Sequence, residues 1–198
     1  MSAPRLIVLA GPNGAGKSTF YAAHLQPLGL DFVNADLLVA TLGLSVEEGA
    51  NAADALRQEF LDERKSFVTE TVFSDPVGAK LQFLREAIAA GYEVALLFIG
   101  LSSAALSEAR VAHRVAGGGH DVPSEKLARR YAQSLENLAQ AMRFVPTVYL
   151  FDNSSAATPH RLVLTVRGGL AKCEVRELPR WAADVLKASR LPGQSAET

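Results

Sequence analysis

The sequence contains a single cysteine, Cys173, so no disulfide bond can form within the chain. A lone thiol is typical of proteins from a reducing compartment, and we expect Cys173 to be packed in a strand rather than reactive. An excess of charge of one sign is missing too, because 20 lysines and arginines oppose 21 aspartates and glutamates. The resulting net charge of −1 argues against a dedicated nucleic-acid-binding protein.

Long hydrophobic runs are also missing from the sequence. No apolar run approaches the roughly 18 residues that a membrane-spanning helix needs, and residues 1–4 are too short for a signal peptide. We therefore expect a cytoplasmic protein without a membrane partner. The composition still supports a folded core, because 48% of the 198 residues are hydrophobic. A chain of this length predicts a single domain.

A glycine-rich stretch follows the first apolar run and fits the phosphate-loop (P-loop) pattern G-x-x-x-x-G-K-[ST]. Its residues are Gly11, Pro12, Asn13, Gly14, Ala15, Gly16, Lys17, Ser18 and Thr19. Glycines let the backbone curl until several N–H groups point at one anion, and the helix that begins near Lys17 adds the positive end of its dipole. The apolar strand before the stretch argues against a chance glycine-rich turn.

Two side chains of this stretch complete the prediction of a nucleotide site. In P-loop proteins the lysine, here Lys17, reaches the β- and γ-phosphates, and the next hydroxyl, here Ser18, ligates Mg²⁺. The sequence therefore predicts binding of a nucleoside triphosphate, ATP or GTP, together with magnesium.

Segments typical of strands and helices alternate along the chain. We expect strands over residues 5–10, 31–34, 66–70, 92–99 and 145–151, and helices that begin near residues 17, 45, 75, 102 and 123. This alternation predicts an α/β P-loop NTPase fold, with a mostly parallel five-stranded sheet in the nucleotide-kinase order 2-3-1-4-5 and helices on both faces. The C-terminal part, 157–191, is expected to add an antiparallel β-hairpin at one sheet edge and a final helix.

Two signatures of other P-loop classes are absent. No apolar run ends in the Asp-Glu pair of ATPase motors, and the Asn-Lys-x-Asp sequence of GTPases does not occur. Asp152 follows an apolar strand and is an alternative magnesium ligand, although its place after the last parallel strand argues against that role. These absences favour a small kinase.

Two carboxylates at expected strand ends are candidates for the acceptor side of such a kinase. Asp36 follows the second strand, at the end where open α/β sheets bind ligands, and could act as the base for an acceptor hydroxyl. Its structural alternative is a helix N-cap before Leu37. Glu70, which Thr71 follows, could hold a magnesium-bound water or a substrate hydroxyl, or could be a solvent-facing residue.

A lid is predicted over residues 110–123. Arg110 and Arg114 share one helix face because they are four residues apart, and a glycine run follows them. Arginines that close over the phosphates would neutralise charge during transfer. Arg130, on the next expected helix, is a further candidate, and His120 is expected to order the lid. The alternative for any one of these arginines is a solvated helix face.

Several of these motifs together resemble the zeta toxin family. They are the P-loop 11–19, Asn34-Ala35-Asp36, Glu70-Thr71, and the Arg-Val-Ala-Gly-Gly-Gly-His-Asp-Val-Pro segment at 114–123. The resemblance covers residues 6–153 and points to the compact, chromosomal branch of the family. Its members are kinases that phosphorylate UDP-N-acetylglucosamine on a sugar hydroxyl and so poison cell-wall synthesis.

This resemblance implies roles for individual residues. It makes Lys17 the phosphate-binding lysine, Ser18 the magnesium ligand, and Asp36 the carboxylate that activates the sugar hydroxyl. In the family one residue separates the glutamate from the threonine, whereas Glu70 and Thr71 are adjacent here. The residues implied on the substrate side are Asp36, Glu70, Thr71 and His120. The arginines implied at the phosphates are Arg110 and either Arg114 or Arg130.

The resemblance further implies a UDP-amino sugar as acceptor and an antitoxin protein as partner. Two alternatives stay open from the residues themselves. One is a kinase of another sugar, a nucleoside or a nucleic-acid end, and the other is an ATP-dependent binding module with negligible transfer.

Overall fold

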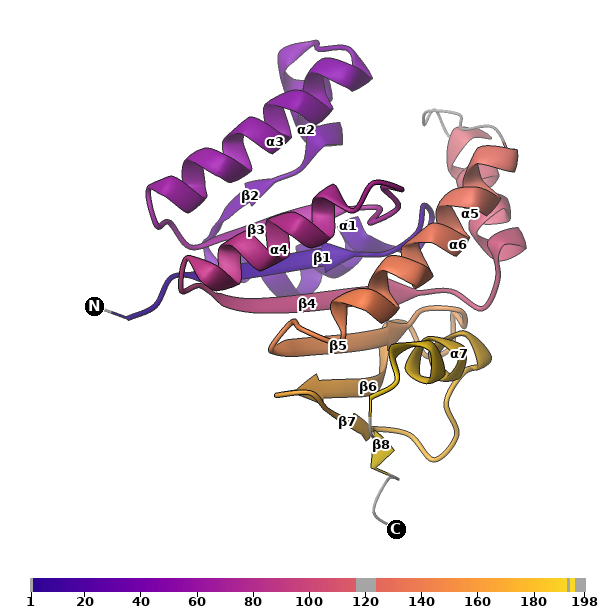
Figure 1. Cartoon of the computed structure of the whole chain (residues 1–198). Helices are drawn as coiled ribbons and strands as arrows, with labels where there is room; N and C mark the ends of the chain where they lie inside the picture. Colours follow the sequence, from indigo (N-terminus) through magenta and orange to yellow (C-terminus); the bar gives the residue numbers. More distant parts are fainter. Residues whose placement is uncertain (1, 117–123, 192, 195–198) are drawn as a thin grey trace.

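Strands and helices alternate along the chain in the computed structural model, which describes residues 2–116, 124–191 and 193–194 (Figure 1). The strands are β1 (Arg5–Ala10), β2 (Asp31–Val33), β3 (Phe67–Thr71), β4 (Glu93–Gly100), β5 (Thr147–Asp152), β6 (Arg161–Arg167), β7 (Leu170–Cys173) and β8 (Gly193–Gln194). The helices are α1 (Lys17–Phe20), η1 (Tyr21–Leu25), η2 (Gln26–Leu28), α2 (Ala35–Leu42), α3 (Val46–Asp62), α4 (Ala79–Ala89), α5 (Ala104–Ala116), α6 (Ser124–Ala141) and α7 (Arg180–Ser189). Within the described residues, no helix has the length and apolar character that a membrane span requires.

The strands form one sheet in the order β2-β3-β1-β4-β5-β6-β7-β8. The first five are parallel neighbours, which confirms the predicted order 2-3-1-4-5. The predicted C-terminal hairpin is also confirmed, because β6 pairs antiparallel with both β5 and β7, and β8 then pairs with β7. Since the five parallel strands point the same way, their carboxyl ends bring residues 11–19, 34–36 and 70–71 to one edge of the sheet.

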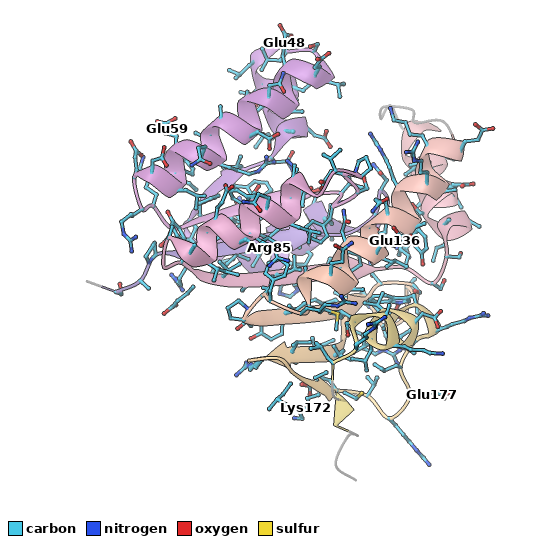
Figure 2. The ribbon with its side chains drawn as sticks, viewed as in Figure 1. Glu48, Glu59, Arg85, Glu136, Lys172 and Glu177 are labelled. Atoms are coloured by element: carbon cyan, nitrogen blue, oxygen red, sulfur yellow. The ribbon has the colours of Figure 1, made fainter. Side chains whose placement is uncertain are left out.

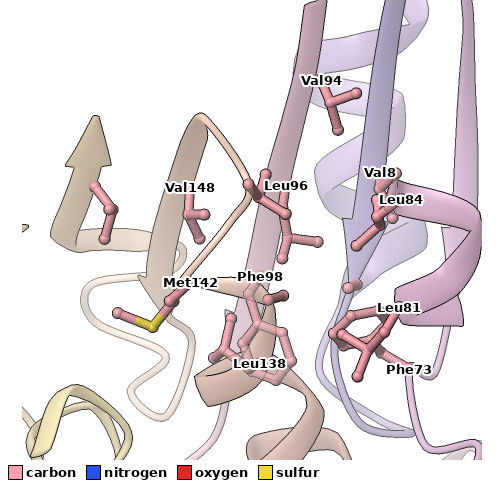
Figure 3. Close-up of a cluster of buried hydrophobic side chains, with 14 of the residues drawn as sticks. Val8, Phe73, Leu81, Leu84, Val94, Leu96, Phe98, Leu138, Met142 and Val148 are labelled. Carbon is pink, nitrogen blue, oxygen red and sulfur yellow. The ribbon is translucent and has the colours of Figure 1, made fainter. Parts of the chain in front are cut away.

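Both faces of the central strand β1 are buried, as its unbroken apolar sequence predicts. Leu6 and Val8 belong to one core cluster, and Leu9 belongs to a second cluster with Phe20 and Leu25 of the α1–η1 segment. Figure 3 shows the first cluster, whose labelled side chains come mainly from β1, β4, β5, α4 and α6. In Figure 1, α4 and α6 lie in front of the sheet and α1 lies behind it, so alternate residues of one strand serve two cores.

The helix that follows the P-loop changes type along its length. It starts as the α-helix α1, continues as the π-helix η1 and closes as the 3₁₀-helix η2. Pro27 lies within η2, and Gly29 ends the helix with a left-handed φ of 65°.

The predicted helix start at Asp75-Pro76 is wrong, because α4 begins at Ala79 after a left-handed Gly78 with φ of 80°. The reason is a contact with α6. Asn137 Nδ2 donates hydrogen bonds to the carbonyl oxygens of Phe73 and Asp75, each at 3.0 Å. These bonds hold the chain in a non-helical path until it has passed the Asn137 side chain.

α3 begins with the capping box that its sequence predicts. Ser45 Oγ accepts the N–H of Glu48 at 3.2 Å, and Glu48 Oε2 accepts the N–H of Ser45 at 2.8 Å. Figure 2 shows Glu48 at the end of the α2–α3 pair that lies away from the sheet. Closer to the sheet, the Arg85 guanidinium carbon of α4 lies 3.8 Å from the Phe144 ring centroid and ties α4 to the segment after α6 (Figure 2).

The C-terminal helix α7 packs on the same sheet. Trp181 is buried, and its Nε1 donates a hydrogen bond to Asp152 Oδ1 at 2.9 Å. Gly100 makes room for the indole, since a Cβ there would lie 2.3 Å from Trp181 Cζ2. Asp152 Oδ1 also accepts the Ser154 hydroxyl at 2.6 Å. Asp152 is therefore used to anchor α7, in line with the argument against a magnesium ligand at this position.

Candidate functional site

The P-loop residues form a tight turn between β1 and α1. Gly11 has a φ of 145°, and a Cβ there would lie 2.3 Å from the carbonyl oxygen of Ile99 on β4. Gly14 has a φ of 69°, and a Cβ there would lie 2.9 Å from the carbonyl oxygen of Ser107 on α5. Glycine is the residue that fits both positions. The loop is thus enclosed by the ends of β4 and α5, which fixes the direction of its N–H groups.

Lys17 lies on the floor of this loop. Its Nζ donates hydrogen bonds to the carbonyl oxygens of Gly11 at 2.9 Å and Pro12 at 3.2 Å, and it lies 3.7 Å from Glu70 Oε1. The Lys17 side chain is 8% exposed, whereas the following residue, Ser18, is exposed. A buried ammonium group and an accessible hydroxyl at the start of a helix suit a phosphate and its metal ion.

Glu70 connects Lys17 to the start of α2. Its Oε1 faces Lys17, and its Oε2 accepts a hydrogen bond from Asn34 Nδ2 at 2.9 Å. The Glu70 side chain is 12% exposed, so the alternative of a solvent-facing residue is wrong. The sequence marks Asn34 only as part of the Asn34-Ala35-Asp36 motif. Its bond to Glu70 spans 36 positions, and no local pattern reveals a contact of that range.

Asp36 lies exposed in the first turn of α2. The helix begins at Ala35, and Asn34 is its N-cap, because Asn34 Oδ1 accepts the N–H of Leu37 at 3.0 Å. Asn34 has the extended backbone that a cap requires, with φ of −137° and ψ of 120°. The alternative that Asp36 caps the helix is therefore wrong. Its carboxylate is left accessible at the carboxyl edge of the sheet.

Thr71 faces away from Glu70, as neighbours in a strand do. Its Oγ1 accepts the N–H of Phe73 at 3.0 Å, and the residue lines a small cavity together with Arg57 and Lys80. The structure thus brings Glu70 together with Lys17 but turns Thr71 to the other side of the sheet.

α5 brings Arg110 next to the P-loop. Ser107 Oγ donates a hydrogen bond to the carbonyl oxygen of Asn13 at 2.6 Å, and a Cβ on Gly14 would lie 3.1 Å from Arg110 Cβ. Arg130 is half-buried on α6, which packs against α5. Neither arginine makes a hydrogen bond or an ion pair to another residue in the described part of the chain.

Two of the predicted lid residues cannot be placed. The side chain of Arg114 and the whole of His120 lie outside the part of the chain that the structure describes. Residues 117–123 of the predicted lid also lie outside the described part of the chain. The lid over 110–123 therefore stays a prediction.

Two residues that the sequence does not predict as part of the site, Asn153 and His160, pack against the P-loop. Asn153 Nδ2 donates a hydrogen bond to the carbonyl oxygen of Ala15 at 2.8 Å, and Asn153 Oδ1 accepts the N–H of His160 at 3.2 Å. A Cβ on Gly16 would lie 2.6 Å from Asn153 Nδ2 and 3.2 Å from His160 Nε2. Asn153 directly follows β5, which could have marked it, whereas no sequence pattern marks His160.

His160 is held in an unusual setting. It has a left-handed φ of 50°, and its ring packs edge-on against Phe20 with centroids 5.3 Å apart. Burial lowers the pKa of His160, the nearby His24 and Arg110 lower it further, and the Gly16 backbone opposes the shift. The imidazole beside the P-loop is therefore biased toward its neutral form.

Solved structures with the same fold include the AvrRxo1-ORF1:AvrRxo1-ORF2 complex with sulphate ions. The chain matches it with a TM-score of 0.70 and 18% identity, over 96% of this chain and 65% of that chain. A structure of that complex with ATP matches with a TM-score of 0.68 and 18% identity, again over 96% and 65%. This chain therefore spans about two thirds of the length of these neighbours.

A third neighbour comes from the PezAT chromosomal toxin–antitoxin system of Streptococcus pneumoniae. Its TM-score is 0.64 at 15% identity, over 94% of this chain and 78% of that chain. At identities this low, the likeness to these three structures establishes the fold and nothing finer.

The comparison at the level of sequence gives the family. A search of curated proteins finds no match to the chain. The profile of a family described as AAA domain matches residues 6–138, which run from β1 through the P-loop, β3 and α5 to the end region of α6. Because the match covers more than half of the residues, this chain belongs to the AAA domain family and has the α/β P-loop NTPase fold.

Proposed function

We propose that this protein is a kinase that uses ATP and magnesium to phosphorylate a hydroxyl group of a small molecule. One observation carries the proposal. At one edge of the sheet, Lys17, Glu70 and the start of α2, which bears Asp36, are joined by direct contacts. A phosphotransferase needs a cationic phosphate site and an acceptor-side carboxylate close together, and this edge supplies both.

On the phosphate side, the N–H groups of the P-loop and the ammonium group of Lys17 hold the β- and γ-phosphates. The accessible Ser18 hydroxyl, next to Lys17 in the chain, fits a magnesium ligand. Magnesium, when bound there, neutralises charge on the phosphate oxygens. GTP is the alternative nucleotide, since these contacts reach phosphates and not the base.

Arg110 supplies further positive charge to the transferring group, because α5 holds it beside Gly14. Either Arg114 or Arg130 acts as a second arginine. Segment 110–123 closes over the nucleotide as a lid and excludes water during transfer.

On the acceptor side, Asp36 orients the hydroxyl and takes its proton. The acceptor oxygen forms a bond to the γ-phosphorus, the bond from that phosphorus to the β–γ bridging oxygen breaks, and ADP leaves. Glu70 lies between the two sides, where it can hold a magnesium-bound water or a substrate hydroxyl. His120 is proposed as a further substrate contact on the family resemblance alone. Thr71, which the resemblance also implies, faces the other side of the sheet.

For the acceptor we propose a UDP-amino sugar such as UDP-N-acetylglucosamine. The support is the resemblance to the zeta toxin family, together with the shared fold of the PezAT neighbour. The same support extends to an antitoxin protein as partner. Another sugar, a nucleoside or a nucleic-acid end is the alternative acceptor, and a binding module with negligible transfer is the alternative function.

The test is incubation of the full chain with ATP, magnesium and UDP-N-acetylglucosamine, followed by mass spectrometry. A product heavier by one phosphoryl group is expected from the wild-type protein and not from Lys17→Ala. If this acceptor stays unmodified, the same assay with a metabolite extract and with 5′-hydroxyl oligonucleotides identifies another acceptor. Slow loss of ATP without any phosphorylated product would reject the kinase and leave the binding module.

A further inference from the structure

Asn34 makes two hydrogen bonds that lead to two different parts of the site. Its Nδ2 donates to Glu70 Oε2 at 2.9 Å, and Glu70 Oε1 lies 3.7 Å from the ammonium group of Lys17. Its Oδ1 accepts the N–H of Leu37 at 3.0 Å in the first turn of α2. Both atoms belong to one planar carboxamide, so they move together. Asn34 thus contacts both Glu70 and the first turn of α2, which carries Asp36.

We propose that Asn34 is a positioning residue that links the P-loop lysine to the placement of α2. The link itself requires only the contacts among Lys17, Glu70 and Asn34. Its consequence for catalysis, the placement of Asp36, rests on the proposed kinase function.

The contacts from Lys17 through Glu70 to Asn34 are largely shielded from water, which strengthens them. The side chains of Lys17 and Glu70 are 8% and 12% exposed, so water competes little for the carboxylate. When triphosphate oxygens attract the Lys17 ammonium group, Glu70 loses part of its counter-charge. It then depends more on the Asn34 amide, because a hydrogen bond to a charged acceptor is among the strong ones. Nucleotide binding thereby fixes Asn34 and the first turn of α2.

Substitutions at position 34 can distinguish this positioning role from simple helix capping. Serine and aspartate cap helices about as well as asparagine does. Neither can replace the Nδ2 donor, since serine is too short to span to Glu70 and aspartate would set a second negative charge against it. A residue that only caps would tolerate Asn34→Ser, whereas a link to Glu70 would not survive it.

The first test is a double-mutant cycle on the full chain without ligand, with Lys17→Met and Asn34→Ser alone and combined. The readout is hydrogen exchange at the amides of residues 35–38. We expect Lys17→Met to change this exchange in the wild-type background and to leave it unchanged in the Asn34→Ser background. Equal changes in both backgrounds, or no change in either, would overturn the proposal.

The second test adds a non-hydrolysable ATP analogue with magnesium. Exchange at residues 35–38 is expected to slow in the wild-type protein and in Ser45→Ala, and not in Asn34→Ser. Ser45→Ala is the matched control, because it removes the N-cap of the neighbouring helix α3 without a contact to Glu70. Slowing of the same size in Asn34→Ser would show that Asn34 only caps α2.

These readouts keep the two proposals apart. If no acceptor is phosphorylated but the cycle shows coupling, the link stands and the kinase assignment fails. If an acceptor is found, Asn34→Ser is expected to lower kcat by about tenfold with little change in the KM for ATP, which corresponds to about 1.4 kcal/mol of lost transition-state stabilisation. A normal kcat in Asn34→Ser would be consistent with the kinase function but would contradict the positioning role of Asn34.

Discussion

Replacement of Lys17 by alanine removes the ammonium group from the floor of the P-loop. We expect phosphoryl transfer to fall by at least roughly a hundredfold, because the phosphates lose a preorganised positive charge. The fold should survive, since Glu70 keeps its hydrogen bond from Asn34. Thermal melting and ATP turnover on one sample test both parts. Lys65→Ala is the control, because its ammonium group is exposed and pairs with Glu63. Retained turnover in Lys17→Ala would contradict the proposed phosphate site.

The variant Asp36→Asn tests a catalytic role of the Asp36 carboxylate without a change in protein stability. Asp36 is exposed and Asn34 caps α2, so the variant should melt like the wild-type protein. As a base, Asp36 would contribute roughly 10²–10⁴-fold, and we expect kcat with the true acceptor to fall within that range while ATP affinity holds. Steady-state kinetics and nucleotide binding measure the two quantities. Near-normal kcat would exclude Asp36 as the base and direct the search to Glu70.

His160 gives a prediction about pH. A histidine whose pKa is lowered by folding stabilises the protein above its unfolded-state pKa of about 6.5. This contribution is lost as pH falls through the lower folded-state pKa. We expect the free energy of unfolding to fall from pH 7 to pH 5, and to fall less in His160→Asn. Asparagine does not titrate in this range and tolerates the left-handed backbone at this position.

Denaturant unfolding at several pH values measures this effect. His113→Asn is the matched control, because His113 is exposed on α5. An equal pH slope in His160→Asn and the wild-type protein would show that the burial of His160 does not govern stability in this range.

The sequence could predict those site residues that belong to a short local pattern. Lys17 and Ser18 follow from the P-loop pattern alone. Asn34 and Asn153 do not, because their partners lie 36 and 138 positions away and the contact arises from the order of strands. The sequence offers Asp36 as the alternative N-cap of α2, although the cap is Asn34, because both residue types cap well and stand two positions apart.

At the scale of an element, the loop between β5 and β6 acts as a support for the P-loop. Asn153 Nδ2 holds the carbonyl oxygen of Ala15. We expect Asn153→Ala to raise the Kd for ATP with magnesium by about 5–10-fold, which corresponds to about 1–1.4 kcal/mol for a lost buried hydrogen bond. Isothermal titration calorimetry measures it. Ser155→Ala, in an exposed part of the same loop, should bind like the wild-type protein. Unchanged affinity in Asn153→Ala would mean that the P-loop holds its shape without this bond.

Element order was predictable because βα alternation and the right-handed crossover leave few topologies for a P-loop sheet. Element boundaries depended on contacts between helices that no local pattern contains. Pro76 suits a first helical position, yet Asn137 delays the start of α4 to Ala79 by binding two carbonyl oxygens of the preceding segment.

At the scale of the whole molecule, the C-terminal segment is joined to the rest through the sheet and through α6. β6 pairs with β5, Trp181 of α7 donates to Asp152, and Arg143 donates to the carbonyl oxygens of Ala188 and Ser189. The hydrogen-bonded sheet also runs without a break from β2 to β8. The sheet crosses the point where the family match ends, at residue 138, because β5 pairs with β4.

This continuity predicts that the protein unfolds in one cooperative transition. Trp181 is the single tryptophan of the sequence and is buried, so its fluorescence reports on α7, while far-UV circular dichroism reports on all helices. We expect both signals to give the same denaturant midpoint, because two probes coincide when one domain unfolds as a unit. A lower midpoint for Trp181 fluorescence would show that the segment after β5 unfolds by itself. The P-loop would then lose the support of Asn153 and His160 before the rest of the sheet unfolds, and ATP affinity should fall along the fluorescence transition.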